Sequence, residues 1–143
     1  MTTALISLVS VIVGILLSHI LTRSGQTNQW ILEQRRLEGR ELIGAITEHY
    51  DAIMFHLAPS ILKNIPVKAE DQIQLDDARR RALRTLRDRI YLASDVKQGN
   101  LSKRWGDAFN TFKDNKESEG VIAFVREYEA ICDFIVKAGI KGS

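Results

Sequence analysis

Residues 4–22, ALISLVSVIVGILLSHILT, decide how this chain is organised. They are nineteen consecutive residues without a formal charge, and they end just before Arg23. At ~1.5 Å of rise per residue, a helix of this length is about 29 Å long, which is close to the ~30 Å thickness of the hydrocarbon core of a bilayer. The stretch predicts a transmembrane helix, and we expect residues 1–23 to form a membrane anchor.

Two other structures have to be weighed for an apolar N-terminal stretch. A secretory signal peptide begins with a basic segment and ends at a small-x-small cleavage site, but this chain has no Lys or Arg before Arg23 and no Ala-x-Ala sequence. A buried helix of a soluble protein rarely runs this long without a polar face. A retained membrane span is therefore the favoured interpretation.

Basic residues follow the predicted span and do not precede it. Arg23, Arg35, Arg36 and Arg40 all lie soon after it, whereas the short N-terminal side carries no basic side chain. Because basic segments next to a span stay in the cytoplasm, we expect an inner (plasma) membrane protein with its N-terminus outside and its C-terminal module in the cytoplasm. The single cysteine, Cys132, excludes an intramolecular disulfide and agrees with a reducing compartment.

One face of the predicted span carries small residues. On a helical wheel, Ser7, Ser10, Gly14 and Ser18 fall within about 80° of one another. A seam of the small-x-x-x-small kind lets two helices approach closely, so it predicts a homo-oligomer formed through the span. Small residues are also common in spans and can share a face by chance, which leaves a span that does not self-associate as the alternative.

The part of the chain after the anchor has helical periodicity and no strand pattern. Its length of about 120 residues suits one domain with one core. Residues 24–28, SGQTN, predict a break at which Thr27 or Asn28 caps a new helix. Amphipathic patterns then predict four helices, at about 28–57, 70–94, 101–112 and 119–138, with Pro59 and Pro66 in the first connector, a turn at 95–100 and Gly139 after the last helix.

Four amphipathic helices with short connections predict an all-α fold, in which the anchor is followed by an antiparallel bundle over residues 24–143. A composition of 45% hydrophobic and 27% charged residues is that of a globular chain, and a net charge of +2 indicates no particular class of partner. The sequence contains no G-x-S-x-G, P-loop, G-x-G-x-x-G or H-E-x-x-H motif. It therefore predicts neither an enzyme nor a cofactor.

A basic face on the helix predicted at 70–94 is the strongest candidate for binding. Residues 79–104 contain nine basic and two acidic side chains. On a helical wheel, Arg80, Arg84, Arg87 and Tyr91 fall within about 60° of one another. Such a face can hold a phosphate-rich ligand, for example a nucleotide, a nucleic acid or an anionic lipid headgroup. A solvated helix face, partly neutralised by nearby aspartates, is the alternative.

The surroundings of two large side chains, Trp30 and Arg89, depend on how the helices pack. Trp30 follows the span closely, so its indole suits either the headgroup region or packing within the bundle. Arg89 falls among apolar positions and needs a carboxylate partner on another helix, for which Glu48 or Asp133 is predicted.

The candidates for metal binding and catalysis are few. His49 and His56 are seven residues apart, or ~10.5 Å along a helix, which is too far for both to bind one metal ion directly. We expect ordinary half-buried histidines and no metal site. Cys132 has apolar neighbours in the sequence, so we expect a packed and unreactive thiol.

The layout of one N-terminal span and a small helical bundle resembles that of many small bacterial membrane proteins. It is also similar to single-span membrane effectors of antiphage systems, some of which assemble through the span or bind cyclic oligonucleotides. One group of these effectors has a nuclease motif of Arg, four to six residues and His, whereas eight residues separate Arg40 from His49 here. The resemblance therefore implies no catalytic residue.

These observations predict a non-enzymatic, single-pass membrane protein that acts by binding a protein partner or by self-association. The alternative is an effector that disrupts the membrane or forms a pore, and that is controlled by a phosphate-rich ligand on the face formed by Arg80, Arg84, Arg87 and Tyr91.

Overall fold

The computed structural model describes the backbone of residues 2–115 and 117–141, and the side chains of residues 11–115 and 117–141. Within these ranges the regular structure is helical and no strand occurs, so the predicted all-α class is confirmed. The long helices are α1 (Thr2–Ala52), α3 (Ala69–Arg87), α5 (Leu101–Asp114) and α6 (Ser118–Ile140), and the short ones are the π-helix η1 (Ile53–Leu57), α2 (Ala58–Lys63) and α4 (Ala93–Gln98).

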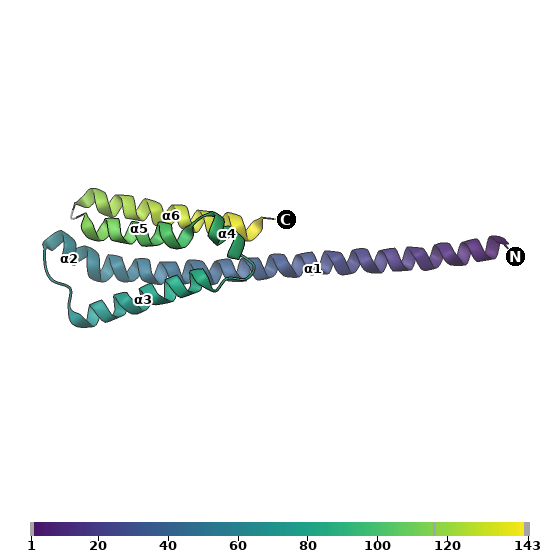
Figure 1. Ribbon diagram of the computed structural model, residues 1–143, viewed down its shortest axis with the longest axis horizontal. Coiled ribbons are helices and arrows are strands. Elements are labelled where there is room, and N and C mark those ends of the chain that lie inside the picture. Colours follow the sequence, from purple (N-terminus) through teal and green to yellow (C-terminus); the bar gives the residue numbers. More distant parts are fainter. Residues whose placement is uncertain (1, 116, 142–143) are drawn as a thin grey trace.

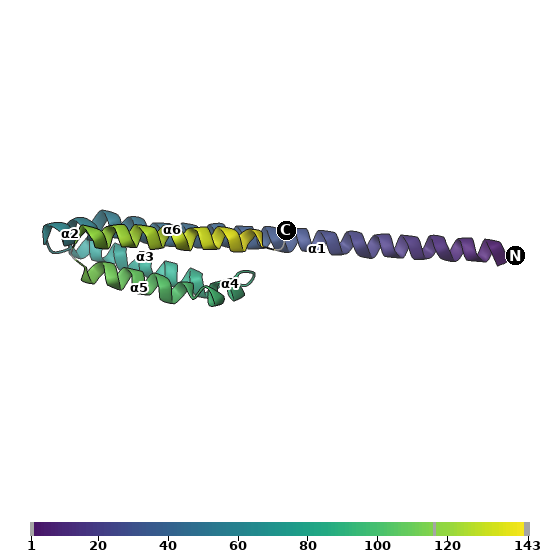
Figure 2. The same ribbon diagram turned by 90° about the horizontal axis from the view of Figure 1, so that it is seen from above.

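The long helices run alternately in opposite directions along the bundle, and α1 projects far beyond it (Figures 1 and 2). Helix α1 has 51 residues, or about 76 Å at 1.5 Å per residue. Its C-terminal half packs between α3 and α6, whereas residues 11–31 are all exposed. We call residues 11–31 the rod. Within the part of the chain that is described, no helix combines the length and the apolar character needed to cross a membrane.

The break predicted at residues 24–28 is wrong, because nothing in that segment prevents a helix. Gly25 costs only about 1 kcal/mol relative to alanine inside a helix. Thr27 does not cap a new helix: its hydroxyl donates a hydrogen bond of 2.8 Å to the carbonyl oxygen of Arg23. Thr22 donates in the same way to Ser18, at 2.7 Å. Since these hydroxyls bond back to the preceding turn, the helix passes through the polar segment unbroken.

The chain also stays helical past Pro59, which the sequence predicts to end the long helix. Helix α1 leads directly into η1 and then into α2, where Pro59 lies in the first turn. In η1 the backbone N–H of Ala58 donates to the carbonyl oxygen of Ile53, five residues earlier. This wider turn shifts the hydrogen-bond pattern just before the proline, which has no N–H to donate. Asn64, in the left-handed conformation with φ of 53°, then ends α2.

Helix α3 ends at Arg87, earlier than the predicted end near Ser94, and residues 93–98 form α4 where a turn is predicted. The cause is on α1. The carboxylate of Glu38 accepts hydrogen bonds from the backbone N–H groups of residues 90, 91 and 92, each at 2.9 Å. A continued helix would need these N–H groups for its own bonds. A helix continued to Ser94 would place Ile90 on its inward face with Leu86. Because the helix stops earlier, Ile90 is 77% exposed.

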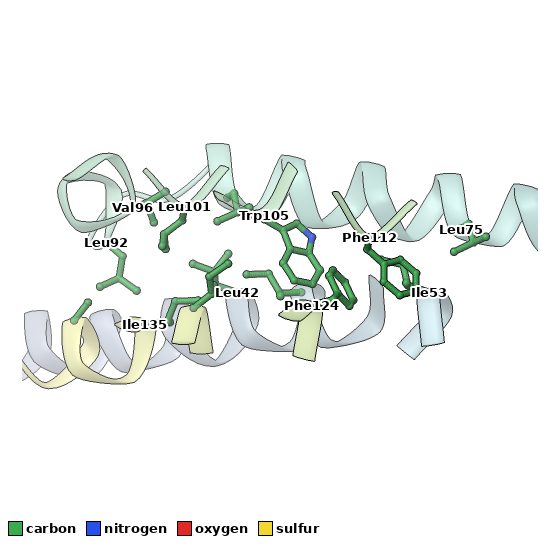
Figure 3. Close-up of a cluster of buried hydrophobic side chains, with 14 of the residues drawn as sticks. Leu42, Ile53, Leu75, Leu92, Val96, Leu101, Trp105, Phe112, Phe124 and Ile135 are labelled. Carbon is green, nitrogen blue, oxygen red and sulfur yellow. The ribbon is translucent and has the colours of Figure 1, made fainter. Parts of the chain in front are cut away.

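The core fills the space between the C-terminal half of α1 and helices α3, α5 and α6 (Figure 3). Trp105 and Phe112 of α5 point towards Phe124 of α6, with ring centroids 5.3 and 4.9 Å from that of Phe124. Most positions that helical periodicity places on the inward side are buried, namely Leu42, Ile46, Ile53, Leu57, Leu75, Ala78, Ala82, Leu86, Leu101, Trp105, Phe112, Phe124, Ile131 and Ile135. Other predicted inward positions are half-buried, namely Ala108, Phe109, Val121, Val125, Tyr128 and Cys132, and Ala93 is exposed.

The sequence predicts that Gly139 follows the last helix, but it lies inside this helix, because α6 continues to Ile140. It is buried against α1, where a Cβ atom would lie 3.8 Å from the carbonyl oxygen of Arg35. This is an ordinary contact distance, so the close packing of α6 on α1 here does not depend on the absence of a side chain.

Candidate functional site

A cluster of charged side chains ties three elements together near the place where the rod leaves the bundle. Arg35 donates hydrogen bonds to the carbonyl oxygens of Tyr91 and Ala138, both at 2.7 Å, and to the Asp95 carboxylate at 2.8 Å. The side chains of Arg35 and Asp95 are 17% and 11% exposed, so water screens this ion pair only in part. We call the three residues Arg35, Glu38 and Asp95 the clamp.

Glu38 contributes a different kind of contact to the clamp. Three consecutive backbone N–H groups converge on its carboxylate, which is an arrangement that proteins use to bind anions. The side chain belongs to α1 and the N–H groups to the connector between α3 and α4. The clamp thus fixes this connector, and with it the C-terminal end of α6, to the base of the rod.

The predicted basic face is kept only in part, because Arg80, Arg84 and Arg87 share α3 whereas Tyr91 lies beyond its end. Tyr91 lies in the connector after α3, where its ring contacts Trp30 edge to face with centroids 5.6 Å apart. Trp30 therefore packs against the bundle. Arg80 is paired with Asp77 of its own helix at 2.7 Å. Arg84 and Arg87 are exposed, and neither has an ion-pair partner among the described residues.

Most of the other arginines near the end of α3 hold helices together. The guanidinium of Arg79 lies over the ring of Phe109 of α5, 5.1 Å from its centroid. Arg81 pairs with Glu48 at 2.6 Å, and Arg89 pairs with Glu41 at 2.7 Å.

The predicted partners of Arg89 are therefore wrong. Glu48 is taken by Arg81, and Asp133 pairs with Lys137 of its own helix at 2.6 Å. The reason is the antiparallel register of α1 and α3, which places residue 89 beside residue 41 and residue 81 beside residue 48. The carboxylate that pairs with Arg89 is thus that of Glu41, whose side chain is 68% exposed.

His49 is fully buried, not half-buried as predicted. The Trp105 indole N–H donates to its Nδ1 atom at 2.9 Å, while its Nε2 atom is buried and has no hydrogen-bond partner among the described residues. Burial, with a smaller contribution from the charge of Arg79, lowers the pKa of His49 to about 4. The imidazole is consequently neutral at physiological pH. His56 is half-buried, as predicted, and its Nδ1 atom lies 3.0 Å from the Asp71 carboxylate.

The structure gives the surroundings of the candidate metal ligands and of the thiol. No group of three or more His, Cys, Asp or Glu side chains among them is placed to hold a metal ion. Cys132 is half-buried, and burial raises the pKa of its thiol, although a hydrogen bond with Tyr128 acts in the opposite direction. The hydroxyl groups of Tyr128 and Thr47 are hydrogen-bonded at 2.8 Å. A thiol with a raised pKa is a poor nucleophile at neutral pH.

The predicted small-residue seam is only partly within the described side chains. Ser7 and Ser10 lie outside them. Gly14 and Ser18 belong to the exposed rod, and a Cβ atom at Gly14 would meet no atom within 4 Å. The seam therefore makes no contact with the bundle at Gly14.

No protein-family model, no curated protein and no solved structure matches this chain. The class that the fold and its clamp define is an all-helical bundle from which one long helix projects.

Proposed function

We propose that this chain is a single-pass membrane protein, in which residues 4–22 anchor the bundle and the bundle acts without catalysis, by binding a partner protein or by self-association. The observation that carries the proposal is the surface of the rod. Eight large apolar side chains between Val11 and Leu21 are 47–70% exposed. Burying one such side chain is worth about 1.5–3 kcal/mol, so leaving all of them in water is strongly unfavourable.

The distribution of these side chains favours a bilayer over a second protein as their surroundings. They occupy Val11, Ile12, Val13, Ile15, Leu16, Leu17, Ile20 and Leu21, and so cover every side of the helix. A partner helix covers one stripe, whereas hydrocarbon surrounds the helix completely. Residues 4–22 are nineteen residues without a formal charge, and a span requires a stretch of about this length.

The continuity of α1 defines how an anchor of this kind would carry the bundle. From Thr22, at the end of the predicted span, to Arg35, in the clamp, there are thirteen residues of unbroken helix, or about 20 Å. Such a helix holds the bundle away from the membrane surface, where a partner in the cytoplasm can reach it.

The alternative, a membrane-disrupting effector controlled by a ligand on Arg80, Arg84, Arg87 and Tyr91, has less support. Arg80 is paired with Asp77 and Tyr91 faces Trp30, so the two ends of that set are engaged elsewhere. The anchored partner-binding protein is the function that the geometry supports best.

Extraction of membranes with alkaline buffer tests the anchor. The full chain is expressed in bacteria, and the membrane fraction is washed at high pH. We expect the wild-type chain to stay in the membrane pellet. The double variant Val13→Arg with Leu17→Arg should leave it, because each arginine near the centre of a span costs roughly 2.5–3.5 kcal/mol on insertion scales.

The matched control places the same two charges on the bundle. Ile73 and Ile122 are exposed apolar side chains of α3 and α6. The double variant Ile73→Arg with Ile122→Arg should stay in the pellet like the wild type. A wild-type chain that is released by the alkaline wash, or a control that is released as completely as the rod variant, would overturn the proposal.

A further inference from the structure

The arginines between residues 79 and 89 divide into two groups. Four of the six have a described partner: the Phe109 ring for Arg79, and carboxylates for Arg80, Arg81 and Arg89. The remaining two, Arg84 and Arg87, have none among the described residues. Both are exposed on α3 one turn apart. Their surroundings differ, because Arg87 lines a cavity whose lining does not include Arg84.

This cavity, of about 310 Å³, lies between the end of α3, α4 and the start of α5. Arg87 and Lys97 bring two positive charges to its wall, and Asn100 and Ser102 bring an amide and a hydroxyl group. Its remaining lining is small or apolar, from Leu86, Ala93 and Val96. We call it the α4 pocket.

No carboxylate lines the α4 pocket to neutralise the two cations. The acidic residue of α4, Asp95, is buried, and its carboxylate is bonded to Arg35 of the clamp. Lys97 has no ion-pair partner among the described residues. Two like charges at one cavity repel each other, and an anion that binds between them removes this cost.

We propose that the α4 pocket binds the phosphate group of a small soluble anion. A guanidinium group donates paired hydrogen bonds to phosphate oxygens, and an ammonium group adds a compact charge. The Ser102 hydroxyl and the Asn100 amide supply neutral donors at the same cavity. The volume is sufficient for a phosphate group with part of the molecule that carries it.

The choice of a soluble anion over a lipid headgroup rests on the proposed membrane anchor. The connector next to the α4 pocket is held by Glu38, which lies sixteen residues beyond Thr22. Sixteen residues of straight helix place this level about 24 Å beyond the end of the predicted span. That distance is beyond the reach of a headgroup at the membrane surface.

Phosphate binding by the full chain in detergent micelles tests the proposal. Thermal unfolding is followed with increasing inorganic phosphate, against potassium chloride at the same ionic strength. We expect phosphate to raise the unfolding temperature of the wild type. Arg87→Gln and Lys97→Gln should each weaken the apparent affinity about tenfold, as expected for the loss of a charge-assisted hydrogen bond.

Arg84→Gln is the matched control. It removes the same charge from a side chain that lies one turn away from Arg87 and does not line the pocket. It should keep the affinity of the wild type. Absence of a phosphate effect on the wild type, or an equal loss of affinity in Arg84→Gln and Arg87→Gln, would overturn the site. Phosphorus NMR line broadening of inorganic phosphate provides a second readout for any variant that unfolds at a lower temperature.

Vesicles separate the two sources of a phosphate group. Wild-type chain reconstituted with phosphatidic acid should bind inorganic phosphate as well as chain reconstituted with neutral lipid. If phosphatidic acid removes phosphate binding, the pocket takes a lipid headgroup and the assignment to a soluble anion is wrong.

Discussion

At the scale of single residues, His49 shows how strongly the core constrains a polar side chain. It accepts a hydrogen bond from Trp105, contacts the Phe109 ring at 5.3 Å between centroids, and leaves Nε2 without a partner among the described residues. Protonation would place a charge in this apolar setting beside Arg79. Folding therefore requires the neutral imidazole, which links stability to pH.

The sign of this pH dependence follows from the pH at which His49 is protonated in the unfolded and in the folded state. An imidazole in the unfolded chain takes up a proton near pH 6.5, whereas His49 in the folded chain does so only near pH 4, because burial lowers its pKa to about 4. Between these values the unfolded state binds more protons. The contribution of neutral His49 to the free energy of unfolding is fully present above about pH 6.5. It decreases as the pH falls towards 4, by about 3 kcal/mol in total.

Urea unfolding of the wild type and of His49→Asn at pH 7 and pH 5 measures this effect. Asparagine keeps an oxygen that can accept the Trp105 hydrogen bond but does not titrate. We expect the wild type to lose more free energy of unfolding than the variant between the two pH values. Equal losses would show that the stability change comes from carboxylates and that His49 is not its source.

The sequence predicts part of the surroundings of His49 and Arg89, but not their partners. The placement of His49 beside an apolar stripe predicts partial burial, but the hydrogen bond with Trp105 joins residues 56 positions apart, which no local pattern encodes. The same holds for Arg89. Its position among apolar residues predicts the need for a carboxylate, whereas the identity of Glu41 depends on the register between two helices.

At the scale of helices and connectors, apolar periodicity predicts the packed faces well and the helix ends poorly. The inward positions of α3, α5 and α6 follow a helical repeat and are buried or half-buried. The end of α3 is set by the Glu38 carboxylate, and the passage of the chain beyond Pro59 is set by the π-turn of η1. Both depend on hydrogen bonds that the amphipathic pattern does not contain.

The clamp should therefore control the stability of the connector between α3 and α4. Glu38→Ala would leave three neighbouring backbone N–H groups without their acceptor, at a cost of about 2–4 kcal/mol. We expect much faster amide hydrogen exchange at residues 90–92 and little change in α5. Glu33→Ala, which removes an exposed carboxylate from the same helix, is the control and should leave exchange at residues 90–92 unchanged. If Glu38→Ala exchanges there like the wild type, the clamp does not hold the connector.

At the scale of the whole molecule, one helix serves both the rod and the bundle. Its apolar N-terminal stretch is evident from composition, and the expectation of helices after it is confirmed. The continuity between the two parts is not predicted, because Gly25 and the hydroxyl residues around it are typical of a break. They remain helical because Thr22 and Thr27 bond to the preceding turn and because Gly25 costs little.

Continuity matters for the proposed function, since a flexible linker would let the bundle fall onto the membrane or swing freely. A straight helix would instead fix the distance between a bilayer and the surfaces that we propose to bind other molecules. The clamp and the α4 pocket lie at the end of the bundle from which α1 projects (Figure 1), so in that arrangement this end would face the membrane at a level that soluble ligands can reach.

The central claim is that residues 4–22 lie in a bilayer, and cysteine accessibility in intact vesicles tests it most directly. In a Cys132→Ser background, single cysteines replace Leu16 and Gln29, both exposed in the rod. Full-length chains in lipid vesicles then react with a maleimide that does not cross membranes. The account predicts that the chain with Leu16→Cys is protected until detergent is added, while the chain with Gln29→Cys reacts at once. Rapid labelling at both positions before detergent would contradict it.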